Sequence, residues 1–325
     1  MKEWSLRLLA LLFGTLAALM LGEGLVRLVA PQKLVKPCLQ PDNELGYRYQ
    51  PHCCFLDDWH PEWFTYHVCT NALGLRMPHE VSSDDGRARW LWLGDSFTFG
   101  WGVEAPQSWL TQLDSLGQAS PCPRQMVNGG HPGWGTSQQV VFLERMLPRV
   151  HPTRVWYAFH ETDPFDNMGA TAVFGFRQKG DTLQLYRRPA RTGALAWLNA
   201  QPWYLWLQQH SHLFVLVKQT LTGRASRRRQ PRAYASLPDL PEVERLTARV
   251  TLAEIDSLIA ICRKAEVPFG LVWLPSMQEL PLDFPDDWQA EWSLVAFKDT
   301  LRAHLARQQV PFVDCTPAFR QKAIA

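Results

Sequence analysis

The sequence has no excess of charge of either sign. Its 325 residues contain 33 Lys or Arg against 31 Asp or Glu, a formal net charge of +2 at pH 7. Proteins that bind nucleic acid usually carry a marked excess of positive charge, which attracts them to the phosphate backbone. The near-neutral balance therefore argues against a nucleic-acid partner. The length allows one main globular domain with a sizeable buried core.

The sequence also lacks the ligand spacing of a common metal site. Four of its seven cysteines cluster early, at Cys38, Cys53, Cys54 and Cys69. The adjacent pair at 53 and 54 does not match the usual spacing of zinc ligands. In an oxidising compartment the four could instead form two disulfides, whose pairing the sequence leaves open. We expect no metal and no other cofactor.

One long apolar run stands near the N-terminus. Residues 8–22 carry no charge and follow Lys2 and Arg7. A bilayer crossing takes ~20 residues, so the segment is long enough if Glu23 and Arg27 lie at the far interface. A cleaved signal peptide is the alternative, although no Ala-x-Ala site precedes a polar start. The run predicts a single-pass anchor in the inner (cytoplasmic) membrane, with the globular domain outside the cytoplasm by the positive-inside rule.

The rest of the chain divides by pattern. After an anchor or signal at residues 1–30, residues 31–87 form an irregular lead-in with short strands near 47–49 and 64–68. From 88 to 325, short apolar runs alternate with helical patterns, which predicts a parallel sheet with helices on both faces. The runs lie at 88–94, 124–130, 153–160, 269–275 and 310–314, and the helical patterns at 137–147, 252–265 and 292–308.

A tryptophan-rich and basic stretch, about residues 169–250, interrupts this alternation. We interpret it as an insertion over the carboxyl edge of the sheet, where ligands bind in such folds. Its basic part is expected to be a solvated loop, with contact to anionic lipid headgroups or to an acidic polymer as the alternative.

Three polar loops follow predicted strands at that edge. Ser96 comes directly after the run at 88–94 and just before a helix start, a geometry that lifts a side chain to the edge of the sheet. Backbone N–H groups at a helix start can also stabilise an oxyanion. Gly-Asp-Ser is common in turns, but the loops at 127–139 and 159–168 follow the next two strands. The three loops together indicate a catalytic site.

These segments resemble the SGNH, or GDSL-type, hydrolase family. Its bacterial membrane-anchored members are the most similar, because they combine an N-terminal span with a phrase like that at residues 70–78. The resemblance implies an α/β, three-layer flavodoxin-like fold with a parallel sheet, in addition to the N-terminal transmembrane helix. It also implies a serine ester hydrolase, or an O-acetyl transferase, that acts on acylated carbohydrate or lipid and faces the periplasm or cell exterior.

The resemblance carries over to five positions. Ser96 matches the nucleophile, whose N–H also serves the oxyanion hole, and Gly133 matches the glycine that supplies a second N–H. The family's third block usually reads Gly-x-Asn-Asp, with the asparagine as third donor. Here Thr162 replaces that asparagine and His160 replaces the glycine. Asp163 is expected to fix its loop, and His160 is a candidate surrogate base.

The family's usual base is missing from this sequence. That base is a histidine in a C-terminal Asp-x-x-His phrase, and no such phrase follows residues 310–321 before Ala325. The phrase at Asp57 to His60 lies in the lead-in and fits chance. Three interpretations stay open: a longer gene product holds the pair, the protein is an inactive member that binds glycan or lipid, or the base has moved. No pattern indicates an oligomeric state.

Overall fold

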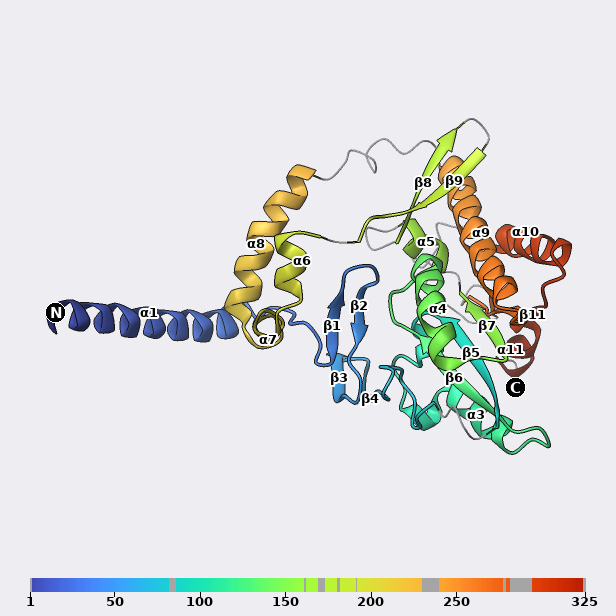
Figure 1. Cartoon of the computed structure of the whole chain (residues 1–325), viewed down its shortest axis with the longest axis horizontal. Helices are drawn as coiled ribbons and strands as arrows, with labels where there is room; N and C mark the ends of the chain where they lie inside the picture. Colours follow the sequence, from blue (N-terminus) through green and yellow to red (C-terminus); the bar gives the residue numbers. More distant parts are fainter. Residues whose placement is uncertain are drawn as a thin grey trace. The chain divides into compact units, whose positions relative to one another are not determined.

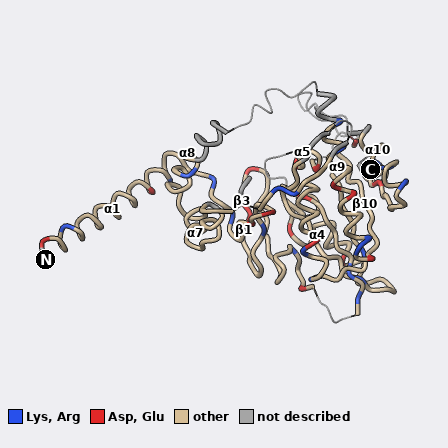
Figure 2. Tube along the Cα trace, turned by 45° about the horizontal axis from the view of Figure 1, so that its top comes forward, with Lys and Arg blue, Asp and Glu red and all other residues tan. Residues whose placement is uncertain are grey.

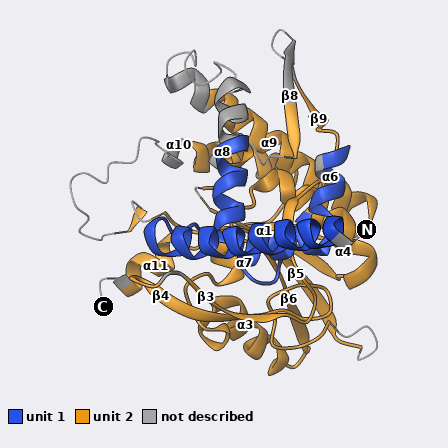
Figure 3. Cartoon of the chain, turned by 90° about the vertical axis from the view of Figure 1, so that its left-hand side faces the viewer, with its two compact units in different colours: residues 1–41, 191–237 blue, residues 42–190, 238–325 orange. Residues whose placement is uncertain are grey.

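A computed structural model describes residues 2–81, 86–160, 162–168, 173–179, 182–190, 192–229, 240–276, 279–280 and 294–323. The chain divides into two compact units, which are coloured separately in Figure 3. The smaller unit combines Met1–Pro41 with Arg191–Leu237, and the larger combines Asp42–Ala190 with Pro238–Ala325. The middle of the tryptophan-rich stretch therefore belongs with the N-terminal helix.

The larger unit is built on a five-stranded sheet in the order β11-β10-β7-β5-β6 (Figure 1). Every neighbouring pair is parallel. Counted along the chain within this sheet, the order is the 2-1-3-4-5 of flavodoxin-like folds. The strands are Ala88–Gly94 (β5), Arg124–Gly130 (β6), Arg154–Phe159 (β7), Phe269–Trp273 (β10) and Phe312–Asp314 (β11). Each lies within one of the five predicted runs, and the predicted fold class is confirmed.

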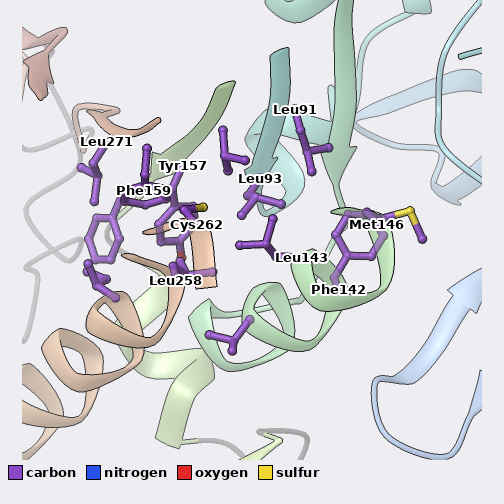
Figure 4. Close-up of a cluster of buried hydrophobic side chains, with 14 of the residues drawn as sticks. Leu91, Leu93, Phe142, Leu143, Met146, Tyr157, Phe159, Leu258, Cys262 and Leu271 are labelled. Atoms are coloured by element: carbon purple, nitrogen blue, oxygen red, sulfur yellow. The ribbon is translucent and has the colours of Figure 1, made fainter. Parts of the chain in front are cut away.

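Helices cover both faces of this sheet. They are α2 (Ser96–Phe99), α3 (Trp109–Gln118), α4 (Thr136–Val150), α5 (Asp163–Met168), α9 (Leu240–Lys264), α10 (Leu294–Arg307) and α11 (Thr316–Ala323), with a 3-10 turn at Ala105–Gln107. Leu91 and Leu93 of β5 pack in one apolar cluster with α4 and α9 (Figure 4). Trp92, between them, packs in a second cluster with Leu110 of α3. Because successive strand residues point to opposite faces, the two clusters mark the two faces of a three-layer unit.

The helical period of the sequence explains how α9 packs. Ile255, Leu258, Ile259 and Cys262 recur at helical spacing and are all buried in the larger cluster. Such a stripe lets one side of the helix lie on the sheet while the other stays polar. The helix extends the predicted pattern at 252–265 toward the N-terminus, and the predictions at 137–147 and 292–308 correspond to α4 and α10.

The other strands form three separate two-stranded sheets, β1-β2, β3-β4 and β8-β9. They are β1 (Leu39–Asp42), β2 (Gly46–Tyr49), β3 (Cys54–His60), β4 (Phe64–Cys69), β8 (Phe174–Lys179) and β9 (Thr182–Arg187). The predicted strands near 47–49 and 64–68 correspond to β2 and β4. β3 and β4 form an antiparallel hairpin that a disulfide between Cys54 and Cys69 joins at its ends. The antiparallel β8–β9 hairpin, within the predicted insertion, was not expected.

The smaller unit is helical. It contains α1 (Lys2–Val29), α6 (Ala194–Asn199), α7 (Pro202–His210) and α8 (His212–Arg229). α1 is long and apolar enough to cross a membrane, and almost none of its apolar part is buried in the structure. Its charged residues stand only near its two ends, as Figure 2 shows. A membrane span and a signal sequence both fit this description.

Candidate active site

Ser96 is the first residue of α2, a single helical turn that begins directly after β5. Its side chain is half-buried, and its hydroxyl forms no hydrogen bond with the described part of the chain. The carboxylate of Asp95 caps the turn by accepting the Phe97 N–H at 2.9 Å. Gly100 ends the turn in the left-handed region, at φ 81°. Strand, cap and short helix together hold Ser96 at the carboxyl edge of the sheet.

The register of the sheet brings three loops to this point. Gly94 of β5 pairs with Gly130 of β6 on one side and with Ala158 of β7 on the other. Ser96 and His160 therefore each lie two residues beyond the same pair. Because neighbouring strands are about 4.8 Å apart, the residues that follow them meet around Ser96.

Two glycines let α2 lie directly on the strand ends. A Cβ on Gly130 would stand 2.4 Å from the Phe99 nitrogen, and one on Gly94 would stand 2.8 Å from Thr98 Cβ. Real Cβ atoms essentially never approach other atoms so closely, so a side chain at either position would push the turn off the sheet. The position of Ser96 depends on this contact.

Gly133 lies in the loop after β6, where its φ is +72°. A Cβ there would stand 2.7 Å from Tyr47 Oη, which donates to the Pro132 carbonyl at 3.0 Å. Neither the Ser96 N–H nor the Gly133 N–H donates to a residue that the structure describes. Both therefore remain available to an added acceptor, which is what an oxyanion hole needs.

The loop after β7 connects His160 and Thr162 to Asp95. The Thr162 hydroxyl donates to Asp95 Oδ2 at 3.0 Å and lies 3.1 Å from His160 Nδ1. The imidazole ring of His160 stacks on Phe97, with ring centroids 3.9 Å apart. Asp163 accepts the His160 N–H at 2.8 Å, which fixes the start of the loop. A series of contacts thus runs from Asp95, the cap of α2, through Thr162 to His160.

Burial determines the charges of Asp95, His160 and Asp163 in this network. It raises the pKa of Asp95 to about 6, although the Phe97 N–H and the Thr162 hydroxyl favour the ionised form. Burial lowers the pKa of His160 to about 4 and raises that of the fully buried Asp163 well above its ordinary value. At neutral pH Asp95 is ionised and His160 is neutral.

These charges select one tautomer of His160. Ionised Asp95 can only accept, so Thr162 uses its hydroxyl proton on Asp95 and can accept from His160 Nδ1–H. The Thr162 N–H is also near Nδ1, but at 3.4 Å this contact is longer than an ordinary hydrogen bond. A proton on Nδ1 leaves the lone pair on Nε2, the tautomer that a general base uses.

Arg76, in the phrase at residues 70–78, fixes the chain that follows α2. Its buried guanidinium donates to the carbonyl oxygens of Phe99 at 3.1 Å, Val103 at 2.7 Å and His67 at 2.9 Å, and also to that of Gly100. The sequence pointed to this phrase only through its resemblance to the family. A buried arginine with carbonyl partners has no periodic signal that could have revealed its role.

A buried ion pair closes the far end of the same edge. Lys298 of α10 contacts Glu279 at 2.7 Å and Asp314, the last residue of β11, at 2.8 Å. Trp273 Nε1 also donates to Glu279, at 2.8 Å. The carboxylates of Glu279 and Asp314 are thus paired with Lys298, and we assign Asp314 a structural role.

Neither the Asp-x-x-His phrase of the lead-in nor a cluster of metal ligands adds a group to this site among the described residues. Asp57 of the lead-in Asp-x-x-His phrase lies in β3 and accepts the Tyr66 hydroxyl at 3.0 Å, whereas the His60 side chain is outside the described residues. Within the described ranges, no three His, Cys, Asp or Glu side chains gather closely enough to hold a metal ion.

No protein-family model and no curated protein matches the sequence. The chain is similar to SGNH-family esterases. The solved structures include AlinE4, "a SGNH-hydrolase family esterase", at TM-score 0.36 and 11% identity over 75% of this chain and 82% of that one. TesA matches at TM-score 0.36 and 11% identity, over 69% and 76%. Esterase EstA from Pseudoalteromonas matches at 0.36 and 10%, over 73% and 94%.

Proposed function

We propose that the protein is an SGNH-type serine hydrolase, or an acyl transferase of the same kind, that acts on acylated carbohydrate or lipid. One observation carries the proposal. Ser96 begins a helix at the carboxyl edge of a parallel sheet, and the unused N–H groups of Ser96 and Gly133 lie on two adjacent loops there. That combination of a raised hydroxyl and nearby backbone donors suits attack on an ester carbonyl.

The proposed first step is attack by Ser96 Oγ on the acyl carbon. The carbonyl oxygen becomes an oxyanion that accepts from the N–H groups of Ser96 and Gly133. The serine proton moves to the base and then to the departing alcohol, which leaves an acyl-serine. Water, or an acceptor hydroxyl in a transferase, attacks next and frees Ser96 by the same proton route.

We assign the base to His160, acting through Nε2. By strand register it follows the strand next to that of Ser96, and its Nδ1 faces the hydroxyl of Thr162. Thr162 matches the family's third oxyanion donor, but its hydroxyl is used on Asp95. We therefore propose that Thr162 positions His160. The hydrogen bond between a catalytic base and its serine often forms fully only when substrate binds.

A second function rests on the free hydroxyl of Ser96. No described residue hydrogen-bonds to it, and a serine without a base stays protonated at neutral pH. In that case the same edge would bind an acylated glycan or lipid without cleaving it.

Labelling with a fluorophosphonate separates the two functions. The hydrolase proposal expects a covalent adduct on Ser96, seen by mass spectrometry, and none in Ser96→Ala. If His160 is the base, His160→Gln should slow labelling by about 100-fold or more, whereas His79→Gln, an exposed control, should not. If His160→Gln is labelled at the wild-type rate, His160 is not the base. A folded protein that stays unlabelled would refute the hydrolase and favour binding alone.

We also propose that α1 anchors the protein in the inner membrane, as a single span with the globular domain outside the cytoplasm. Its length and apolar character support a span, and the disulfide between Cys54 and Cys69 supports an oxidising compartment. A peptide tag placed after Ala325 should be removed by protease added to bacterial spheroplasts whose inner membrane is intact. Cleavage only after that membrane is lysed would reverse the topology.

A further inference from the structure

The smaller unit exposes three large aromatic side chains. Trp197 of α6 is 61% exposed, and Trp203 and Trp206 of α7 are 52% and 57% exposed. Trp203 and Trp206 are three residues apart, so they share one face of α7, whereas Tyr204 and Gln208 are buried. Large exposed apolar side chains on successive helices are typical of a surface that contacts a partner or a membrane.

Hydrogen bonds fix the junction of α7 and α8 to the end of α1. The Glu23 carboxylate accepts from the Ser211 hydroxyl at 2.7 Å and from the N–H groups of His212 and Leu213 at 2.9 and 3.0 Å. These are the first N–H groups of α8, so a residue of α1 caps that helix. Arg27 also donates to the His210 carbonyl at 2.7 Å.

This junction sets the depth of α7 and α8 if α1 spans a membrane. The 20 residues from Leu8 to Arg27 would rise ~30 Å, the thickness of the hydrocarbon layer. Glu23 and Arg27 then lie near the far interface, and the α7–α8 junction lies at the same level. Figures 1 and 3 both show α8 running crosswise to α1, so α8 would lie along the membrane surface.

Residues 191–237 carry an excess of positive charge, which is complementary to an anionic membrane surface. Between residues 191 and 237 the sequence has no Asp or Glu and seven basic residues: Arg191, Lys218, Arg224, Arg227, Arg228, Arg229 and Arg232. Basic residues beside a bilayer that contains anionic lipid are attracted to its headgroups. Tryptophan side chains also prefer the interface, because one end is apolar and the other carries an N–H.

We propose that α6, α7 and α8 form a membrane-contacting surface, with Trp197, Trp203 and Trp206 in the headgroup layer of a bilayer that contains anionic lipid. The occupant is the surface of the same bilayer that α1 crosses, so this inference rests on the proposed anchor. The contact would hold the smaller unit flat against the membrane.

The test uses the full chain in vesicles of phosphatidylcholine and phosphatidylglycerol, with lipids brominated near the headgroup as fluorescence quenchers. Four of the 15 tryptophans, Trp4 and the three of this surface, should contact lipid, so about a quarter of the emission should be quenched. In the variant with Trp197, Trp203 and Trp206 all changed to Phe, only Trp4 should contact lipid. The quenched share should then fall to about a twelfth of the emission of the remaining tryptophans. Trp63→Phe, an exposed control in the larger unit, should leave the quenched amount unchanged.

The outcomes separate this inference from the anchor. A protein that does not float with the vesicles, and whose Trp4 is not quenched, contradicts the anchor. A protein that floats but shows the same quenched emission in the triple variant as in the wild type contradicts the surface. Hydrogen exchange of the wild type gives a second measurement that needs no variant. Amides of α7 and α8 should exchange more slowly with phosphatidylglycerol present than in phosphatidylcholine alone, and equal rates would overturn the anionic contact.

Discussion

The hydroxyl of Thr162 makes two contacts that one substitution removes. Thr162→Val keeps the branched shape but deletes the oxygen that lies 3.0 Å from Asp95 Oδ2 and 3.1 Å from His160 Nδ1. A hydrogen bond to a charged group contributes ~1.5–3 kcal/mol, and the exposed position of Thr162 favours the lower part of that range. We expect the variant to lose about 2 kcal/mol of unfolding free energy at about pH 8.

The loss should depend on pH because Asp95 titrates. Its pKa is raised to about 6 by burial, and the Thr162 hydroxyl limits that rise. A carboxyl with a raised folded pKa contributes stability below its unfolded pKa, and this contribution is lost as the pH rises through the folded pKa. Without the hydroxyl the folded pKa of Asp95 moves higher still, so the variant continues to lose stability above pH 6. Its deficit is therefore larger at about pH 8 than at about pH 5.

Urea unfolding of the full chain in detergent, followed by tryptophan emission at both pH values, measures this deficit. Thr162→Ser keeps the hydroxyl and should unfold within about 0.5 kcal/mol of the wild type. In the labelling assay Thr162→Val should also slow the reaction of Ser96 and change its pH profile, and Thr162→Ser should do neither. Equal deficits at the two pH values, or a serine variant as unstable as the valine variant, would refute the bond to ionised Asp95.

Three other substitutions test buried contacts of the larger unit. Arg76→Met removes the donors to four carbonyl oxygens and should cost about 2–4 kcal/mol in urea unfolding; a loss under about 0.5 kcal/mol would contradict the role of this arginine. Gly130→Ala should displace α2 and abolish labelling of Ser96, whereas Gly24→Ala, with no atom near its Cβ, should not; normal labelling of the first variant would show that α2 can shift freely. Glu254 is fully buried without a hydrogen bond to any described residue, and burial raises its pKa. Glu254→Gln should therefore gain stability relative to the wild type as the pH rises from about 5 to 8, and a pH-independent difference would show that Glu254 does not titrate in this range.

The parallel sheet can be predicted from the sequence because burial on both faces leaves a simple pattern. β5 and β7 lie inside the sheet, so they appear as continuous apolar runs and show no alternation. The helices between them have the apolar stripe of a helix with one buried side. The strand ends follow from the same runs, which is why Ser96 could be placed at the edge of the sheet.

The grouping of the smaller unit could not be predicted in this way. It depends on Glu23, which contacts Leu213 across a sequence separation of 190 residues. A glutamate near the end of an apolar helix looks like the limit of a membrane span, and nothing local in the sequence shows that it caps another helix. The β8–β9 hairpin did leave a signal, the alternation at residues 182–187, which the surrounding tryptophan-rich text obscured.

The two departures from the family's third block are connected in the structure. Thr162 stands where the motif has an asparagine that faces the oxyanion, and its hydroxyl instead links Asp95 to His160. His160 stands where the motif has glycine, and its ring stacks on that of Phe97, the residue after Ser96. Either change alone would remove something from the site, a donor in one case and open space in the other. Together they place an imidazole whose Nδ1 faces Thr162, itself bonded to the buried carboxylate of Asp95, in the loop that follows the strand next to β5. We propose that this arrangement takes over the function of the C-terminal histidine and aspartate in the SGNH motif.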